Sequence, residues 1–483
     1  MDQQARGADF LQLDPASAPG GGRAGWLADR LREAVADGRL PLGARLPPSR
    51  HLAAELGWSR GVVVEAYQRL AEQGLLTARS RDGTRVALVP PRPAPASGAS
   101  GPAAGSAPGS PPRTSAAHLP ADVVDLTPGV PDLDLFPRTA WLRAEREALL
   151  GLGAGGLRYG EPAGEPALRQ ALAGWLGRQR GLRTTPEAVV VVTGVAQALA
   201  LTATVLRRAG HAQVAVEDPG SRGARDELAY WGLAPVPVPV DEEGLDVEAL
   251  EQGTVGVVVT TPAHQYPTGV ALSSARRTRL LRWATGSDGL VVEDDYDAEQ
   301  RYDRAPAPAL HPAAPERVLH TGSVSKALAP ALRLGWLVVP EHLRAAVVEA
   351  KHMSDIATPT LPQLTLARLL TSGTYDQHLR RARRHQRTRR DALADALETH
   401  LRDVPGARVR GVAAGLHLLL ELPGHDDVAL AAALAADGVV VDPLARHRVE
   451  PGPGGLVLGY AASPPHRLAA AAAAVARAVR SGP

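Results

Sequence analysis

The sequence contains no cysteine, and lysine occurs only twice in its 483 residues, at Lys326 and Lys351. The absence of cysteine excludes disulfide bridges, cysteine-ligated zinc and a cysteine nucleophile, and it is compatible with a reducing compartment. Lysine is scarce although positive charge is not, because lysine and arginine together number 53. In such a chain a lysine is retained either for the chemistry of its amine or by chance. We expect that Lys351 is retained by chance.

A large net charge and a secretion signal are also lacking. The formal net charge is only +2, so any affinity for nucleic acid must come from a local patch. The N-terminus has no basic start followed by an apolar run, as a signal peptide would have. Residues 188–206 are long enough to cross a membrane, but they divide at Thr193-Gly194 into a β-branched run and an alanine- and leucine-rich run. We therefore expect a strand and a helix there, no membrane contact, and a cytoplasmic protein.

Composition divides the chain into a small and a large block. Residues 90–121 consist almost entirely of proline, alanine, glycine and serine, which predicts a flexible, partly extended linker. We expect a disordered tail at residues 1–22, a first domain at 23–89 and a second domain at 122–483. The apolar fraction of 45% suffices for large buried cores.

The small block is predicted to contain three helices. Residues 24–40 and 59–74 carry apolar side chains at helical spacing, and Ser59 is a candidate N-cap. A shorter helix between them is expected to begin with Ser49 as its N-cap and to end at Gly57. Only two residues separate the second and third helices, which is the spacing of a helix-turn-helix.

A hairpin follows the three helices. Residues 75–88 form two short runs around Asp82-Gly83, a strong hairpin signal, and the whole block is therefore a predicted winged helix-turn-helix domain. Helix N-termini are where base and phosphate contacts begin, and arginines on the second helix and the wing would reach phosphates. The alternative is a helical protein-interaction module with ordinary surface arginines. We favour double-stranded DNA as the partner, bound by Arg50, Ser59, Arg60, Arg81 and Arg85.

Residues 38–87 resemble the GntR-type winged-helix domain over its full length. Two departures from that family stand out. Gly61-Val62 replaces the usual Asn-Thr after the Ser-Arg pair, and Arg81-Asp82 replaces Gly-Ser in the wing. Val62 lacks the hydroxyl of the family's threonine, so the resemblance does not imply a base or phosphate contact at this position.

Strand-like and helix-like runs alternate through the large block, which predicts an α/β domain with a mainly parallel sheet. Ligands of such sheets bind at the carboxyl ends of the strands, and three motifs fall there. The first is the strand-to-helix turn at Thr193–Gln197, whose backbone N–H groups and helix dipole suit a phosphate. The second is "VVEDDYD" (291–297), whose acids could hold a metal, face solvent, or pair one carboxylate with a protonated ring nitrogen.

The third motif is "GSVSKALAPALRLGW" at residues 322–336. Ser323 and Ser325 flank Lys326, and Arg333 lies seven residues farther on. A lysine amine can form a Schiff base with an aldehyde, whereas a guanidinium stays protonated and is a poor nucleophile. This is a chemical reason to keep a lysine in an arginine-rich chain. The alternative is that Lys326 is retained by chance.

Together with "RYGEPAGEPALRQALAGWL" and "TPAHQYPTG", these motifs resemble the fold-type I aminotransferases that use pyridoxal 5′-phosphate (PLP), over about residues 122–483. With the GntR-type domain in front, the chain resembles the MocR/GabR group of transcription regulators. This resemblance implies a multidomain protein: an α+β winged helix and an α/β aminotransferase-like domain with a smaller α+β subdomain. It also implies a homodimer, possibly head-to-tail.

The resemblance implies roles for particular residues. Lys326 would carry PLP as an aldimine, Asp294 would pair with the pyridine nitrogen, and Tyr296 would donate to the ring phenolate oxygen. Arg446 would bind the carboxylate of an effector. The full set of implied cofactor-binding residues is Tyr159 (across a dimer interface), Gly194, Val195, Ala196, Asp294, Tyr296, Ser323, Ser325, Lys326 and Arg333; no metal site is implied.

Three departures from the group concern the effector. Ser221 stands where the group commonly has a tyrosine by the cofactor, and His447 lies where the group commonly has "SRYY". His264 and Tyr266 stand in the region where true aminotransferases usually have the asparagine of an Asn-Pro-Thr-Gly turn. We expect a transcription regulator that senses PLP or an amino compound. The rival hypotheses are a working aminotransferase with a DNA-binding appendage, and a DNA-binding protein whose large domain is an inactive scaffold.

Overall fold

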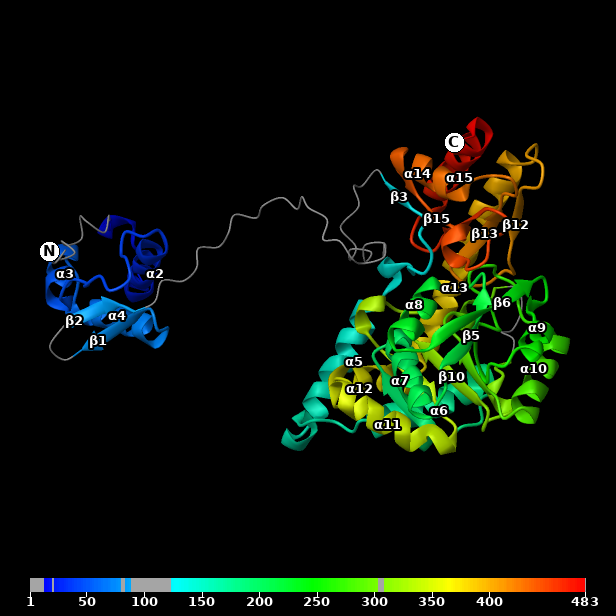
Figure 1. The fold of residues 1–483 in the computed structure, drawn as a ribbon, viewed down its shortest axis with the longest axis horizontal. Helices are drawn as coiled ribbons and strands as arrows, with labels where there is room; N and C mark the ends of the chain where they lie inside the picture. The colour runs from blue at the N-terminus through cyan, green and yellow to red at the C-terminus, as the bar shows by residue number, and fades with distance from the viewer. Residues whose placement is uncertain (1–12, 20, 80–82, 88–122, 303–307, 483) are drawn as a thin grey trace. The chain divides into compact units, whose positions relative to one another are not determined.

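The computed structural model describes residues 13–19, 21–79, 83–87, 123–302 and 308–482. The chain divides into two compact units, Met1–Arg113 and Thr114–Pro483, coloured blue and cyan to red in Figure 1. The division falls inside the predicted linker, residues 90–121, which lies outside the described residues.

The N-terminal unit is a winged helix-turn-helix, as the sequence predicts. Its core is formed by apolar side chains such as Leu27, Leu52 and Leu70, which are all but fully buried. Its elements are the helices α2 (Arg23–Ala36), α3 (Ser49–Leu56) and α4 (Arg60–Glu72) and the antiparallel strands β1 (Leu76–Arg79) and β2 (Gly83–Val86).

One prediction for this unit is wrong in part. Pro15–Ser17 form a short 3₁₀ turn, η1, and the Leu13 side chain is buried in the core of the unit. The disordered tail predicted for residues 1–22 therefore does not extend through these residues, because Leu13 supplies apolar surface that the small core buries.

An eight-stranded sheet forms the centre of the second unit. Neighbouring strands in the series β10-β9-β8-β5-β6 are parallel, whereas β11 is antiparallel to both β4 and β10, and β7 is antiparallel to β6. Valine-rich strands buried on both faces are typical of such sheets. In spatial order the strands are β4 (Val189–Val192), β11 (Gly335–Val338), β10 (Val318–Ser323), β9 (Leu290–Asp294), β8 (Val257–Thr260), β5 (Gln213–Asp218), β6 (Ala234–Asp241) and β7 (Gly244–Leu245).

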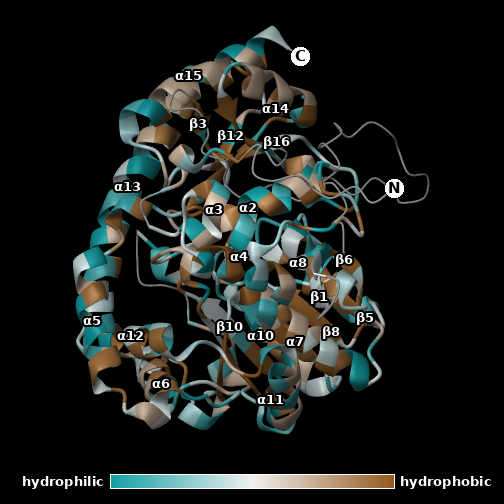
Figure 2. Cartoon of the chain, turned by 90° about the vertical axis from the view of Figure 1, so that its left-hand side faces the viewer, coloured by the Kyte–Doolittle hydropathy of each residue, from teal (hydrophilic) through white to brown (hydrophobic). Residues whose placement is uncertain are grey.

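Helices surround this sheet, and hydrophobic strands lie inside. The hydrophilic faces of the outer helices α5 (Arg138–Gly151) and α13 (Thr374–His400) face away (Figure 2). The prediction of an α/β domain with a mainly parallel sheet is confirmed. The helices of this part are α5 (Arg138–Gly151), α6 (Pro166–Arg180), α7 (Val195–Arg208), α8 (Arg222–Tyr230), α9 (Val247–Gln252), α10 (Ser274–Gly286), α11 (Glu341–Asp355) and α12 (Thr360–Thr371).

The long helix α13 (Thr374–His400) leads into the smaller α+β subdomain, also as predicted. Its antiparallel sheet has the order β12-β13-β16-β15, and a short parallel pair joins β3 to β14. A leucine-rich core lies between this sheet and the last helix. The elements are β3 (Val124–Asp125), β12 (Arg408–Arg410), β13 (His417–Glu421), α14 (Asp427–Ala436), β14 (Val439–Val440), β15 (Asp442–Pro443), β16 (Gly455–Gly459) and α15 (Pro465–Ser481).

The apolar stretch at residues 188–206 is the strand β4 followed by the first turns of α7, as predicted. Within the part of the chain that the structure describes, no helix is long and apolar enough to span a membrane.

Candidate cofactor site and DNA-binding surface

The three sequence motifs meet at one edge of the large sheet. β9 and β10 are parallel and end at Asp294 and Ser323, and β4 runs the same way because β11 is antiparallel to both β4 and β10. The carboxyl ends of these strands therefore lie at the same edge, where open α/β sheets bind their ligands.

An anion-binding corner lies at the beginning of α7. Gly194 precedes this helix with φ +115°, and no side chain caps the helix among the described residues. The Arg333 guanidinium lies beside it, since a Cβ atom added to Gly194 would be 3.2 Å from both Nη atoms. Ser323 is part of the same corner, because a Cβ on Gly335 would contact both Gly194 Cα, at 3.0 Å, and Ser323 Cβ, at 3.2 Å. The guanidinium and the helix N-terminus with Val195 and Ala196 suit a phosphate.

The amine of Lys326 is held close to the backbone of Gly129. Its Nζ donates a 2.6 Å hydrogen bond to the carbonyl oxygen of Gly129. Gly129 has φ +91°, and a Cβ there would lie only 2.8 Å from Nζ, so a side chain at this position would displace the amine. Burial lowers the pKa of Lys326, and the nearby carboxylates of Asp297 and Asp294 oppose that shift.

The three aspartates at the end of β9, Asp294, Asp295 and Asp297, differ in their hydrogen-bond partners. Asp295 is buried and paired with Arg180 through bonds of 2.6 and 2.9 Å, and Asp297 is buried against His264 at 2.8 Å. Asp294 differs, because its Oδ1 atom is buried and has no hydrogen-bond partner among the described residues. Burial, with Asp295 and Asp297 nearby, raises the pKa of Asp294 to about 7. This environment favours a positively charged partner over a fully solvated strand end.

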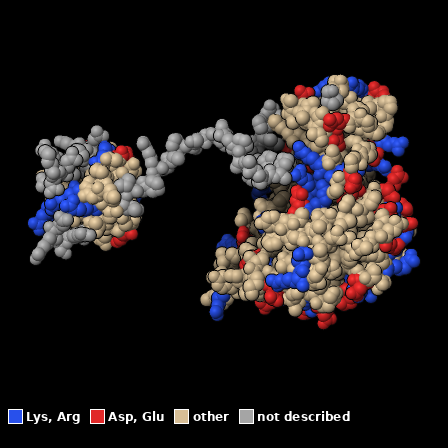
Figure 3. Space-filling view, viewed as in Figure 1, with Lys and Arg blue, Asp and Glu red and all other residues tan. Residues whose placement is uncertain are grey.

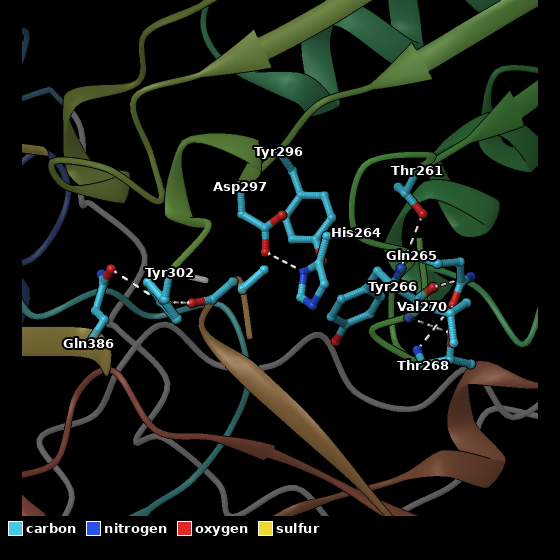
Figure 4. A network of polar contacts seen from close by, with 12 residues as sticks. Thr261, His264, Gln265, Tyr266, Thr268, Val270, Tyr296, Asp297, Tyr302 and Gln386 are labelled. Atoms are coloured by element: carbon cyan, nitrogen blue, oxygen red, sulfur yellow. Dashed lines mark hydrogen bonds and ion pairs between the residues drawn. The ribbon is translucent and has the colours of Figure 1, made fainter. Parts of the chain in front are cut away.

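Tyr296 belongs to a cluster of rings and a carboxylate (Figure 4). Its hydroxyl lies 3.0 Å from His264 Nδ1, which in turn lies 2.8 Å from Asp297 Oδ2. The His264 ring also packs 5.1 Å from the ring of His417, a residue of the smaller subdomain, and Tyr266 packs 5.0 Å from His417. The cluster thus connects the loops after β8 and β9 to β13.

One ligand atom each from His264, Asp297 and His417 lies within 4.8 Å of the others, a spacing that a metal ion could use. We assign no ion there, because Nδ1 of His264 is engaged by both Asp297 and Tyr296. The predicted absence of a metal site stays a prediction.

Two of the predicted residues lie apart from this cluster. Tyr159 is 87% exposed and belongs to no described contact with the corner at α7. Arg446 is half exposed and forms a 3.4 Å ion pair with Asp442, whose other oxygen lies 3.3 Å from His447 Nε2. Arg225 donates to the carbonyl oxygens of both Arg446 and His447, which fastens this loop to α8.

Ser323 and Ser325 contact each other in the loop that carries Lys326. The backbone N–H of Ser325 donates to Ser323 Oγ at 3.3 Å, so the first hydroxyl helps to shape the loop that carries Lys326. Ser221 has a local role, because its Oγ accepts a 3.2 Å bond from the N–H of Ala224 and caps α8.

Sequence reasoning missed several residues that shape the site. Arg180 and Gly129 are far in sequence from their partners Asp295 and Lys326, and neither carries a local signal of that contact. From the sequence, His264 is identified only as a departure from the aminotransferase pattern. Its place in "TPAHQYPTG", shortly after the strand β8, is a signal for a position near Tyr296, which follows the neighbouring strand β9. Gln265 was also missed. Its side chain donates to Glu217 and to the Pro219 carbonyl. It accepts from the Thr268 hydroxyl, which shapes the same loop (Figure 4).

The predicted DNA-binding residues divide by exposure. Arg50, Ser59 and Arg60 are exposed, and Arg60 Nε at the start of α4 lies 3.4 Å from Ser49 Oγ at the start of α3. Arg85 instead donates to the Gly43 carbonyl at 3.0 Å, which ties the wing to the preceding loop. Arg81 lies outside the described residues.

Positive side chains gather on part of the N-terminal unit (Figure 3). Exposed Arg45, which was not predicted, lies beside the wing, since a Cβ on Gly83 would be 2.9 Å from its Nε. A basic surface of this kind is the electrostatic footprint of DNA binding.

Comparison with known proteins decides the family. Residues 24–86 match the model for bacterial regulatory proteins of the gntR family, and residues 121–475 match aminotransferase class I and II. The HTH-type pyridoxine biosynthesis transcriptional regulator PdxR of Corynebacterium glutamicum is 32% identical over 439 residues, 90% of this chain and 91% of that protein. A probable rhizopine catabolism regulatory protein, MocR of Rhizobium meliloti, is 32% identical over 92% of this chain and 90% of its own length.

The chain belongs to the MocR/GabR-type transcription regulators.

A solved structure supports the fold of this MocR-type regulator. The kynurenine aminotransferase of Pyrococcus horikoshii, crystallised with PMP, is 26% identical with a TM-score of 0.69, and the match covers 75% of this chain and 91% of that one. The aminotransferase likeness is thus confined to the second unit, whereas the regulators match nearly the whole MocR-type chain. A regulator is favoured over an active enzyme for that reason.

Proposed function

We propose that this MocR-type regulator binds PLP at Lys326 and operator DNA through its winged helix, and that the state of the PLP site controls DNA binding. The first unit supplies the reader of DNA, and the second unit supplies the sensor. When bound, PLP supplies an aldehyde that condenses with a primary amine and a ring that withdraws electrons.

The observation that carries this proposal is that three chemically matched groups occupy one sheet edge. PLP has an aldehyde, a basic ring nitrogen and a phosphate. The chain offers the buried amine of Lys326, the unpartnered buried oxygen of Asp294, and Arg333 beside the N-terminus of α7. These residues therefore fit the group.

Each residue contributes a definable step. Burial favours the neutral amine of Lys326, and only a neutral amine is a nucleophile. Asp294 would hold a proton on the ring nitrogen, because a buried carboxylate is stabilised by an adjacent cation. Tyr296 would donate from a hydroxyl that His264 and Asp297 orient. Arg333, Ser323 and the first turn of α7 would hold the phosphate.

We further propose a homodimer in which Tyr159 reaches the cofactor site of the partner subunit. Support comes from exposed apolar side chains near Tyr159 in sequence: Leu150 is 74% exposed and Leu157 is 65% exposed. Exposed apolar surface of this kind is typical of protein interfaces. A dimer would also present two winged helices to two DNA half-sites.

The effector is proposed to be PLP itself or an amino compound with a carboxylate. Arg446 supports the second choice, because its half-exposed guanidinium is available to exchange the Asp442 carboxylate for that of a ligand. The alternative function, a working aminotransferase, would require regeneration of the cofactor by a keto acid at ordinary enzymatic rates.

The experiment that tests the proposal is to reduce the PLP-loaded protein with borohydride and locate the modified peptide by mass spectrometry. The adduct is expected on Lys326. The variant Lys326→Ala should give no adduct and an unchanged circular dichroism spectrum, whereas Lys351→Met at saturating PLP should still be labelled at Lys326. An adduct on Lys351, or one that persists in Lys326→Ala, would contradict the assignment.

A further inference from the structure

We propose that Lys351, the second lysine of the chain, is a positioning residue for the phosphate-binding turn at the start of α7. It acts through two side chains, Asp355 and Gln197, and touches no ligand itself. The inference rests on the proposed function for the identity of the anion, a pyridoxal phosphate. It offers a specific role in place of the expectation that Lys351 is retained by chance.

The first link is a buried ion pair at the end of α11. The Lys351 side chain is fully buried, and its Nζ donates a 2.6 Å bond to Asp355 Oδ1. Burial lowers the pKa of Lys351 and the Asp355 carboxylate opposes that shift. Burying an ammonium group is costly unless it is paired, so a lysine kept here has a specific partner.

The second link runs from Asp355 to the beginning of α7. Gln197 Nε2 donates to Asp355 Oδ2 at 2.9 Å and to Ser354 Oγ at 3.2 Å. The other end of the amide, Gln197 Oε1, accepts a 2.9 Å bond from the backbone N–H of Thr193. Thr193 directly precedes Gly194, the residue against which the Arg333 guanidinium lies.

The direction of these bonds indicates how Lys351 would act on the turn: its ammonium group holds in place the Asp355 carboxylate that accepts from Gln197. A carboxylate paired with an ammonium group only accepts hydrogen bonds, so the Gln197 amide must turn its NH₂ group toward Asp355. Its oxygen then necessarily faces Thr193. The backbone N–H of Thr193 is thus occupied internally, and the turn is fixed with the N–H groups of the next residues directed at the anion corner.

The backbone beyond Asp355 shows that this arrangement is maintained against strain. Ile356 has φ +65° and ψ −62°, and Ala357 N–H bonds back to the Asp355 carbonyl at 2.7 Å, which is a γ-turn. Such a conformation is rare for a β-branched residue. Arg333, which lies against Gly194, also has a positive φ, +48°. Strained residues persist where their surroundings over-determine them, often at ligand sites.

The test compares the binding of PLP with that of pyridoxal, which lacks the phosphate. Dissociation constants are measured by absorbance for the full-length wild type, for Lys351→Met and for Glu349→Gln, a control on the exposed face of the same helix. Lys351→Met should bind PLP about tenfold more weakly, the equivalent of one charge-assisted hydrogen bond. Pyridoxal binding should be unchanged, and Glu349→Gln should match the wild type.

A structural role for Lys351 predicts a different pattern. If Lys351→Met weakened PLP and pyridoxal equally, or weakened neither, the inference would be overturned. Gln197→Leu breaks the same chain of bonds at a partly exposed side chain, and it must reproduce the loss that is specific for PLP even if Lys351→Met folds poorly. A wild type that binds neither compound would refute the proposed function itself.

Discussion

Among single residues, Asp294 carries the clearest electrostatic signature of an intended partner. Its Oδ1 is buried without a hydrogen bond among the described residues, and burial with two neighbouring carboxylates raises its pKa to about 7. In the cofactor-free protein the folded state therefore holds the Asp294 proton more tightly than the unfolded chain does. Stability should fall as the pH rises from about 4 toward 7, because the ionised carboxylate is penalised only in the folded state.

The variant Asp294→Asn removes this penalty and should stabilise the cofactor-free protein at pH 8 by about 1–3 kcal/mol, with little effect at pH 4. Urea unfolding of the apo protein at the two pH values measures the difference. Asp288→Asn, on an exposed turn, is the matched control and should show no such dependence. A gain of equal size at both pH values would show that the raised pKa is not its source.

At this scale, the sequence was informative where a residue type has one good chemical explanation. Lys326 and Arg333 could be distinguished because an amine and a guanidinium do different chemistry. Arg180 could not be assigned, because its partner Asp295 is more than 100 residues away. Lys351 could not be assigned either, because its i,i+4 spacing to Asp355 is ordinary for a helix surface and does not reveal that the lysine is buried. Their roles depend on burial and on which oxygen of a carboxylate remains unpaired.

At the scale of elements, helix positions followed from apolar spacing, and Gly57 ends α3 and Ser59 is at the N-cap of α4 as predicted, whereas the N-cap of α3 was predicted one residue too late. Ser49 was expected to cap α3, but the Pro48 carbonyl accepts the first helical bonds, from the N–H groups of His51 and Leu52 at 2.8 and 3.1 Å. Ser49 is therefore the first helical residue, and the N-cap prediction is wrong. Ser59 is at the N-cap of α4, but its side chain makes no capping bond and remains exposed.

The exposed start of α4 leads to a prediction for DNA binding. Arg60→Ala should weaken binding to operator DNA about tenfold, because one contact of the recognition helix to a base or phosphate is lost. Fluorescence anisotropy at fixed salt measures this, with Arg30→Ala on α2 as a control on an exposed arginine that pairs with Glu33. Unchanged affinity in Arg60→Ala, or an equal loss in Arg30→Ala, would place the reading surface elsewhere. PLP binding should be the same in both variants.

At the scale of the whole molecule, composition alone indicated two folded units, and the fold of each was predictable from its periodicity and motifs. The coupling between the two units was not predictable, because each motif concerns one unit alone. A ligand can shift the molecule between two states only if it binds them unequally. The central claim is therefore thermodynamic: the state of Lys326 must change the affinity for DNA.

The most direct measurement of that claim is the affinity of the full-length protein for its own upstream DNA, with and without PLP, at one salt concentration. In the wild type, PLP should change the dissociation constant at least about fivefold, the lower end of ordinary allosteric coupling. In Lys326→Ala the same PLP concentration should leave it unchanged, with the affinity for DNA otherwise retained. An equal response in Lys326→Ala, or no response in the wild type under conditions that label Lys326, would contradict the account.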